Sequence, residues 1–414
     1  MKDKVVVFSI DAMITKDLET LRSFPESAPL FEKCALVEEM VSVYPALTYP
    51  CHVSIATGCY PEKHGIFHNE KLDINNPHPD WYWFSSYSKV PFIWDYAKKA
   101  GLVTASVFWP VSTGSDIDYR IAKFTDSVVD DEKTRKTQEI YNRYSDLLIE
   151  RKLPDNDIFA NLAACDMIRE IKPDLLFVYC ASIDAKRHKF GVNTELHVDT
   201  LKMVAEHMNA LVQASKDAGT YEDTTFIFLG DHGQIDIKNV FNPNILLAQK
   251  GYIDIAEDGS IKDWRIYCHS AACSCQVYTK DIDEKEAKRV LMEISEEVPG
   301  CIERIMTAFE AKEMYHLEVP CSFVLEGVTG ISFGRDTQGD VLQDTNDSDY
   351  KFGKATHGHA PEKGAKSPFL VSGARAKKGK VIKEARIIDE APTILSIFGI
   401  DMPTSDGHVL DLID

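Results

Sequence analysis

Short apolar runs rich in β-branched residues alternate with longer segments of helical periodicity along most of this chain. That alternation is typical of a mostly parallel sheet with helices covering both of its faces. The fold class is therefore predicted to be α/β. The clearest strands are expected at Val5–Ile10, Val103–Phe108, Leu175–Tyr179, Thr225–Leu229 and Phe369–Val371.

Three segments between these runs have helical patterns: Phe92–Lys99, Glu195–Lys216 and Asp389–Phe398. The first is followed by Gly101 and the last by Gly399, the residue type that most often ends a helix.

The rhythm changes between residues 242 and 354, where Gly, Asp and short strand-like pieces dominate. This part holds one amphipathic helical pattern, Glu284–Glu297, and a strongly polar piece, Arg335–Lys351, expected to be a surface loop. A further sheet strand follows it, so the segment interrupts the main domain. The expected organisation is a catalytic α/β core in residues 1–241 and 355–414, with an inserted α+β capping subdomain in residues 242–354.

The charge balance limits the class of partner. With 46 Lys+Arg against 65 Asp+Glu, the formal net charge is −19, which disfavours long nucleic acids and anionic membranes. No apolar run approaches the roughly 20 residues that a membrane helix needs. The run Val5–Ile10 is too short for an export signal and ends in Asp11, so the ten cysteines are expected to be reduced thiols in a cytoplasmic protein. The oligomeric state cannot be inferred from the sequence.

Aspartates follow three of the predicted strands. Asp11 ends the first, Asp184 comes shortly after Leu175–Tyr179, and Asp231 follows the run that ends at Leu229. Ligands of open α/β sheets bind outside the carboxyl ends of the strands, so these side chains are expected to converge.

Histidines accompany these aspartates: His188 follows Asp184 by four positions, His232 follows Asp231 directly, and His357 precedes the last predicted sheet strand. Carboxylate oxygen and imidazole nitrogen are the ligands of zinc and related ions, and this set is large enough for two ions.

A nucleophile is available in the segment Tyr44–His52. Pro50 suits the first turn of a helix, which would place Thr48 at or just before its N-cap. There the helix dipole and a metal ion would both lower the hydroxyl pKa. Cys51 is the rival nucleophile, but it lies inside the same helix with no evident base.

These pieces, in this order, resemble the type I phosphodiesterase/nucleotide pyrophosphatase family of the alkaline phosphatase superfamily. The resemblance spans nearly the whole chain. It rests on Asp11, Thr48-Tyr49-Pro50-x-His52, Thr57-Gly58-x-Tyr60-Pro61-Glu62-x-His64-Gly65-Ile66, Asn69, Trp109-Pro110, Asp184-x-x-x-His188-x-x-Gly191, Asp231-His232-Gly233 and His357-Gly358.

The resemblance implies an alkaline-phosphatase-like fold and a di-zinc enzyme that hydrolyses small phosphodiesters, with nucleotides among the candidate substrates. Thr48 would attack phosphorus and form a covalent phosphothreonine intermediate, Asn69 would bind a phosphoryl oxygen, and a base would stack on Tyr49. The implied ligands of one zinc are Asp184, His188 and His357, and those of the other are Asp11, Asp231, His232 and the oxygen of Thr48.

The match departs from the family in two places. Lys186 and Arg187 stand where small residues are common, and could offer the substrate a second anionic handle. His359 follows His357-Gly358 and could compete with His357 as a ligand, although the motif aligns at His357.

Two alternative functions stay open. One is a phosphonate hydrolase or phosphomonoesterase of the same superfamily, and the other is a non-catalytic binding protein on this fold.

Overall fold

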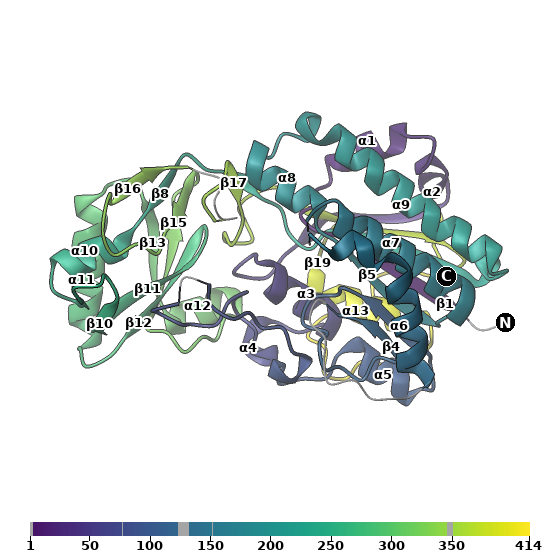
Figure 1. Ribbon diagram of the computed structural model, residues 1–414, viewed down its shortest axis with the longest axis horizontal. Coiled ribbons are helices and arrows are strands. Elements are labelled where there is room, and N and C mark those ends of the chain that lie inside the picture. The colour runs from purple at the N-terminus through teal and green to yellow at the C-terminus, as the bar shows by residue number, and fades with distance from the viewer. Residues whose placement is uncertain (1–2, 77, 123–131, 151, 346–350) are drawn as a thin grey trace.

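Two lobes lie side by side along the long axis of the molecule, and the larger contains both ends of the chain (Figure 1). The computed structural model describes residues 3–76, 78–122, 132–150, 152–345 and 351–414.

An eight-stranded sheet forms the centre of the larger lobe. Its order is β19 (Val381–Arg386), β2 (Cys34–Val41), β18 (Ser367–Gly373), β6 (Thr224–Leu229), β1 (Lys4–Ile10), β5 (Leu175–Cys180), β3 (Thr104–Val107) and β4 (Tyr119–Ile121). β18 is antiparallel to both of its neighbours, and all other pairs are parallel. The predicted α/β class and mostly parallel sheet are confirmed.

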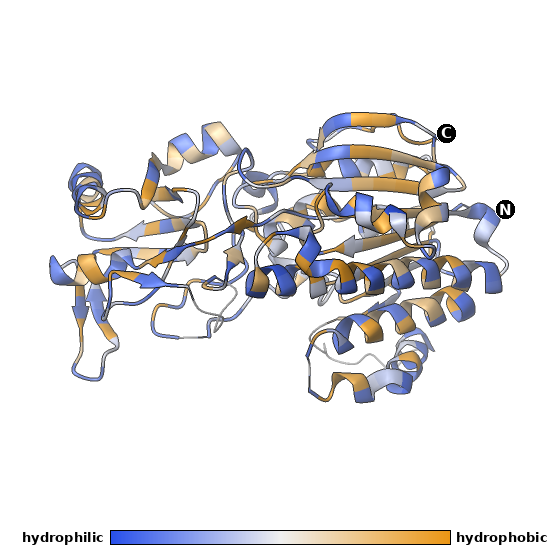
Figure 2. Ribbon diagram, turned by 90° about the horizontal axis from the view of Figure 1, so that it is seen from above, coloured by the Kyte–Doolittle hydropathy of each residue, from blue (hydrophilic) through white to orange (hydrophobic). Residues whose placement is uncertain are grey.

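Helices cover both faces of this sheet because side chains alternate along the strands. Val5 and Val7 of β1 face one apolar core, whereas Val6 and Phe8 face the other. The first core is covered by α3 (Thr48–Thr57), α5 (Ile93–Lys99) and α13 (Glu390–Ser396), with α4 (Pro61–His64) following α3. The second is covered by α1 (Asp17–Ser23), α2 (Ala28–Glu32), α6 (Glu132–Tyr144), α7 (Asp155–Asp166) and α9 (Val198–Asp217). Figure 2 shows the apolar residues concentrated along the strands and on one side of the helices.

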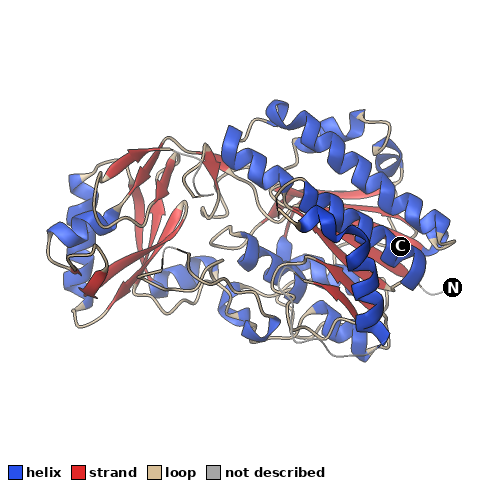
Figure 3. Ribbon diagram, in the orientation of Figure 1, coloured by secondary structure: helices blue, strands red, loops and turns tan. Residues whose placement is uncertain are grey.

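The smaller lobe is built around the four-stranded antiparallel sheet β11 (Ile266–Ala271), β12 (Ser274–Thr279), β14 (Phe323–Gly327) and β13 (Ile302–Thr307) (Figure 3). α10 (Pro243–Gln249) and α11 (Glu284–Glu297) share an apolar core with it, and α12 (Ala308–Tyr315) contacts β13 and β14. The helix predicted at Glu284–Glu297 is present with those bounds.

Shorter elements complete the chain. A three-stranded sheet contains β15 (Ile331–Phe333), β8 (Asn239–Phe241) and β16 (Leu342–Asp344); β9 (Ile253–Ile255) pairs with β10 (Ile261–Trp264), and β7 (Ile235–Asp236) with β17 (Ala355–Thr356). The short helices are η1 (Ser85–Tyr87), η2 (Ser145–Leu148), η3 (Met167–Ile171), η4 (Thr194–His197), η5 (Tyr221–Asp223) and η6 (Ile387–Asp389). The polar piece Arg335–Lys351 contains β16, and its residues 346–350 lie outside the described part.

Among the described residues, none of the helices is both long enough and apolar enough to cross a bilayer. All ten cysteines are free thiols.

Candidate active site

The carboxyl edge of the central sheet collects the predicted ligands. Asp11 directly follows β1, Asp231 follows β6, and Asp184 lies on α8 (Ser182–Phe190), which begins just after β5. β18 runs the opposite way, so its first residues lie at this same edge and the preceding loop brings in His357.

Two groups of three side chains form at this edge, and they share His232. Asp184, His232 and His357 each offer an atom, and these atoms lie within 4.8 Å of one another. The same is true of Asp11, Asp231 and His232.

His188 belongs to the same cluster, because its Nε2 lies 3.2 Å from Asp184 Oδ1. All six charged or imidazole ligands expected from the sequence are therefore together. Because His232 lies between the two groups, the geometry alone does not divide them into two separate ligand sets.

The electrostatics of the cluster favour ionised carboxylates. Burial raises the pKa of Asp184, but the facing His188 and His357 outweigh burial and hold that pKa below its usual range. Burial also raises the pKa of Asp231, yet His232 and His52 outweigh it and lower the pKa to about 2.

Burial lowers the pKa of His357, so this imidazole is neutral at pH 7. Ionised carboxylates and neutral imidazoles are the protonation states that metal ligands require, and the buried pair Asp11 and Asp231 calls for a compensating cation. The donor set therefore fits divalent metal ions.

Thr48 lies beside this cluster, with its Oγ1 3.3 Å from His232 Nε2. The prediction that Thr48 is at or just before the N-cap is off by one position: Leu47, with an extended backbone, is the N-cap, and Thr48 is the first residue of α3. Its hydroxyl therefore does not cap the helix and is directed to the histidine at the positive end of the helix dipole.

Cys51, the rival nucleophile, is fully buried inside α3. Burial, reinforced by the charge of Asp231, raises the pKa of its thiol well above the usual value. A thiol in that state is a poor nucleophile, so Thr48 is the better candidate.

Residues 5–340 match the family model described as type I phosphodiesterase / nucleotide pyrophosphatase. The chain belongs to this family. The resemblance inferred from the ordered motifs is thereby confirmed.

Curated members of the type I phosphodiesterase family align with just over half of the chain. Family member 3 of the ectonucleotide pyrophosphatase/phosphodiesterases from Bos taurus is 27% identical over 241 residues, covering 55% of this chain and 24% of the relative. Venom phosphodiesterase 2 from Crotalus adamanteus is 27% identical over 241 residues, covering 56% of this chain and 27% of the relative. The chain thus spans about a quarter of the length of these relatives.

Solved structures share the fold over almost the entire chain. Human ectonucleotide pyrophosphatase/phosphodiesterase 5 superimposes with a TM-score of 0.71 at 16% identity and covers 99% of this chain and 100% of its own. The murine protein, as an inactive threonine-to-alanine variant in complex with AMP, gives a TM-score of 0.69 at 16% identity over 100% of both chains.

Asn69 is buried next to the start of α3, and its Oδ1 accepts a hydrogen bond from the Tyr49 backbone N–H at 2.9 Å.

The Tyr49 ring is only 2% exposed. It packs edge-on against Trp81 at 5.2 Å and Trp83 at 5.8 Å between ring centroids. Stacking of a base on Tyr49 stays a prediction, and it requires this tryptophan pair to move.

Three further residues contact the candidate ligands, and no role was predicted for any of them. His52 Nδ1 lies 3.2 Å from Asp231 Oδ2, and its Nε2 lies 2.8 Å from Ser9 Oγ. The Tyr179 hydroxyl donates to Asp11 Oδ2, and the Gln234 amide donates to Asp184 Oδ1. His52 could have been found from its place in the Thr-Tyr-Pro-x-His motif, whereas the other two have no local signal.

Arg187 is not a substrate handle. It is fully buried, and its guanidinium contacts both carboxylate oxygens of Asp17 at 2.7 and 2.9 Å and donates to the Ala12 carbonyl. The contacts of Arg187 with Asp17 and with the Ala12 carbonyl hold α8 against the segment that follows β1. The same segment reaches the site, because Ala12 N–H donates to Asp231 Oδ1 at 3.1 Å. Lys186 is exposed, and its Nζ lies 5.6 Å from the centroid of the Phe190 ring.

His359 stays apart from the ligand groups. Its Nδ1 lies 2.9 Å from the carbonyl oxygen of the next residue, Ala360. His357 lies in the cluster, with Nε2 3.6 Å from Asp184 Oδ1, so the geometry favours His357 as the ligand.

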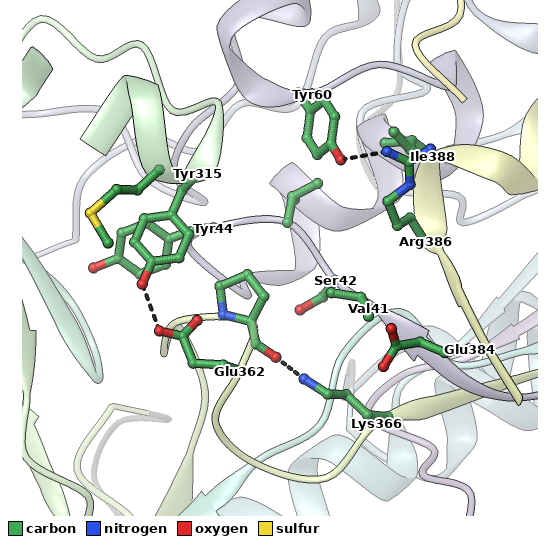
Figure 4. Close-up of a pocket in the computed structure, with 13 residues that line it drawn as sticks. Val41, Ser42, Tyr44, Tyr60, Tyr315, Glu362, Lys366, Glu384, Arg386 and Ile388 are labelled. Carbon is green, nitrogen blue, oxygen red and sulfur yellow. Dashed lines mark hydrogen bonds between the residues drawn. The ribbon is translucent and has the colours of Figure 1, made fainter. Parts of the chain in front are cut away.

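A separate cavity of about 480 Å³ lies where the two lobes meet (Figure 4). Tyr44, Tyr60 and Arg386 line it from the larger lobe, and Tyr315 of α12 lines it from the smaller lobe. None of the predicted ligands lines this cavity. Tyr44, however, belongs to the loop that leads to Thr48.

Proposed function

We propose that this protein is a metal-dependent phosphodiesterase or nucleotide pyrophosphatase that hydrolyses small phosphodiesters through a covalent phosphothreonine intermediate on Thr48. The observation that carries the proposal is the position of Thr48 Oγ1, 3.3 Å from His232 Nε2 at the junction of the two ligand groups.

Two divalent ions, most simply Zn²⁺, would be held by Asp184, His188 and His357 and by Asp11, Asp231, His232 and Thr48. When bound, the ions lower the pKa of the attacking hydroxyl and neutralise the charge of the phosphoryl group. Mixed nitrogen and oxygen donors favour zinc over magnesium or calcium.

The residues of the chain prepare the attack. Thr48 presents its oxygen from the first position of α3, where the positive end of the helix dipole favours an anionic phosphoryl group. Asn69 Oδ1 is engaged by the Tyr49 N–H, which leaves the amide NH₂ to donate to a phosphoryl oxygen.

The reaction then balances in two displacements. The oxygen of Thr48 forms a bond to phosphorus, and the bond from phosphorus to the leaving alcohol or phosphate oxygen breaks. Water next attacks the phosphothreonine, breaks the bond to Thr48 Oγ1 and regenerates the hydroxyl.

The proposed substrates are small phosphoesters, with nucleotides as the first candidates. The AMP complex of the murine structural neighbour supports this choice, and so does the type I phosphodiesterase/nucleotide pyrophosphatase family model. The net charge of −19 disfavours long nucleic acids.

The monoesterase or phosphonatase alternative depended on a cationic handle at Lys186 or Arg187. Burial of Arg187 against Asp17 removes one of these two residues from consideration. The non-catalytic alternative predicts a missing ligand, whereas every expected position is occupied by a suitable residue in the cluster.

The deciding experiment measures bound metal by mass spectrometry and hydrolysis of an aryl phosphodiester by wild type, Thr48→Ala and Cys51→Ala. We expect two zinc ions per chain in the wild type and a loss of at least about 1,000-fold in kcat for Thr48→Ala, as for other nucleophile deletions. Cys51→Ala should retain most of the activity, since a buried structural thiol is inert. Unchanged hydrolysis by Thr48→Ala would contradict the assignment.

A further inference from the structure

Glu326 is a fully buried carboxylate on β14 of the smaller lobe, and it contacts two loops of the larger lobe. Its Oε2 accepts a hydrogen bond from the Tyr44 hydroxyl at 2.9 Å. Its Oε1 accepts from the Ala360 backbone N–H at 3.1 Å and lies 2.8 Å from Lys363 Nζ. Both carboxylate oxygens are therefore used between lobes.

Each contacted loop leads directly to the candidate active site. Tyr44 stands shortly before Thr48, and Ala360 shortly after His357. Glu326 thus holds the nucleophile loop with one oxygen and the metal-ligand loop with the other.

The two loops are also joined to each other beside the site. The Ala46 carbonyl accepts a hydrogen bond from Gly358 N–H at 2.7 Å and lies 3.1 Å from His357 Nδ1. With Nδ1–H bonded to this carbonyl, the His357 Nε2 lone pair is presented to the cluster, since a ligating histidine is oriented by the partner of its other nitrogen. A shift of the Tyr44 loop relative to the His357 loop would therefore rotate this imidazole.

The surroundings of Glu326 keep these contacts in place. Lys363 supplies the opposite charge, and it also contacts Glu303 Oε2 at 2.7 Å on the exposed side. The Tyr44 ring packs against Tyr315 of α12 at 4.7 Å between centroids, on the cavity wall seen in Figure 4. Tyr44, Ala360 and residues of the smaller lobe also share one apolar cluster.

A buried carboxylate with a lysine partner is a costly way to join two lobes, because burial of ion pairs seldom adds net stability compared with apolar packing. The Glu326 carboxylate instead fixes relative position, because this one side chain accepts hydrogen bonds from two specific loops.

We propose that Glu326 is a positioning residue through which the smaller lobe sets the relative placement of the Thr48 loop and the His357 loop. The smaller lobe is then part of the catalytic apparatus as well as a cover. This inference rests on the proposed function for its kinetic consequence, and its effect on metal binding can be measured without activity.

The test compares Glu326→Gln with Glu303→Gln. Glutamine keeps the shape of Glu326 but replaces one acceptor by a donor, so it cannot accept from both loops. Glu303→Gln is the matched control: within the described part of the chain Glu303 contacts the same lysine and Arg304, but neither Tyr44 nor Ala360. Tyr44→Phe removes the hydroxyl that donates to Glu326 and keeps the packed ring, so it is a second, milder variant for the case in which Glu326→Gln fails to fold.

For Glu326→Gln we expect zinc affinity at one of the two sites, measured by chelator competition, to fall by about 10- to 100-fold, as when an outer partner of a metal ligand is removed. The kcat for an aryl phosphodiester should fall with it while KM stays nearly constant, and Tyr44→Phe should show a smaller change of the same kind. Glu303→Gln should leave the zinc affinity and the kcat unchanged.

A purely structural role predicts a different result: a lower Tm with unchanged zinc affinity and unchanged kcat below the transition. That result would overturn the inference. If instead zinc affinity falls but neither the wild type nor Thr48→Ala hydrolyses the ester, the positioning role stands and the proposed function fails.

Discussion

His52 Nδ1 lies 3.2 Å from Asp231 Oδ2 and 2.8 Å from the Thr48 carbonyl oxygen, so one imidazole joins the first turn of α3 to a carboxylate that follows β6. Ser9 Oγ, 2.8 Å from Nε2, fixes the other side of the ring. The proposed nucleophile Thr48 and the candidate metal ligand Asp231 are thereby held by the same residue, although His52 itself lies outside the two groups of candidate ligands.

Replacement of His52 should weaken metal binding more than it weakens folding. For His52→Gln we expect zinc affinity to fall by about 10- to 100-fold, with activity partly restored by excess zinc, because outer partners orient the metal ligands. Chelator competition measures the affinity. Ser9→Ala, which removes only the distant contact of the ring, is the control and should show a smaller effect, and equal zinc affinity in His52→Gln and wild type would contradict the role.

Arg187 and Lys186 should differ sharply in what they do. Arg187→Met leaves the fully buried Asp17 carboxylate without its partner, and breaking such a pair costs about 3–5 kcal/mol of unfolding free energy. Lys186→Met, on the exposed side of α8, should change stability by less than about 0.5 kcal/mol. Urea unfolding measures both, and a large rise in KM for Lys186→Met with unchanged stability would revive the idea of an anionic handle at Lys186.

The features of the fold and of the candidate site that can be predicted from the sequence are those specified by residues close together in the chain. Asp11 and Asp231 each follow a strand rich in apolar residues, and Glu284–Glu297 has a strong helical period, so their positions could be predicted from nearby residues alone. β2 is absent from the predicted strands because Glu38 and Glu39 lie inside it and interrupt its apolar run.

The misread and missed site residues depend on contacts between distant parts of the chain. Arg187 is buried because Asp17, 170 positions earlier, lies against it. Glu326 reaches Tyr44 across 282 positions. No local pattern specifies such pairs. The cytoplasmic location and the boundaries of the inserted subdomain stay predictions.

Binding of AMP should change the environment of Trp81 and Trp83. These indoles cover Tyr49, so a base can reach the tyrosine only if they move. We expect a change in tryptophan emission on titration with AMP that disappears in the double variant Trp81→Phe/Trp83→Phe and persists in Trp264→Phe, which lies in the smaller lobe. An unchanged spectrum together with measurable AMP binding by calorimetry would place the base elsewhere.

His64 should make the protein more sensitive to acid. Its ring is fully buried, with Nε2 2.9 Å from Ser54 Oγ and Nδ1 accepting from Ile66 N–H at 3.0 Å, and burial lowers its pKa to about 3. In the unfolded chain a histidine titrates near pH 6.5, so the unfolded state binds the extra proton first as the pH falls. The stability that depends on the neutral ring is therefore complete above about pH 6.5 and is lost as the pH falls from there toward 3.

Well below pH 6.5 this loss amounts to about 1.4 kcal/mol per pH unit. His64→Asn cannot take up the proton, so its unfolding free energy should fall less steeply between about pH 5.5 and 4 than that of wild type, by up to this amount per unit. Urea unfolding of metal-free protein at several pH values measures both slopes, and His78→Asn, at an exposed position, serves as the control. Parallel slopes for His64→Asn and wild type would mean that the folded protein admits a proton at His64 as readily as the unfolded chain does.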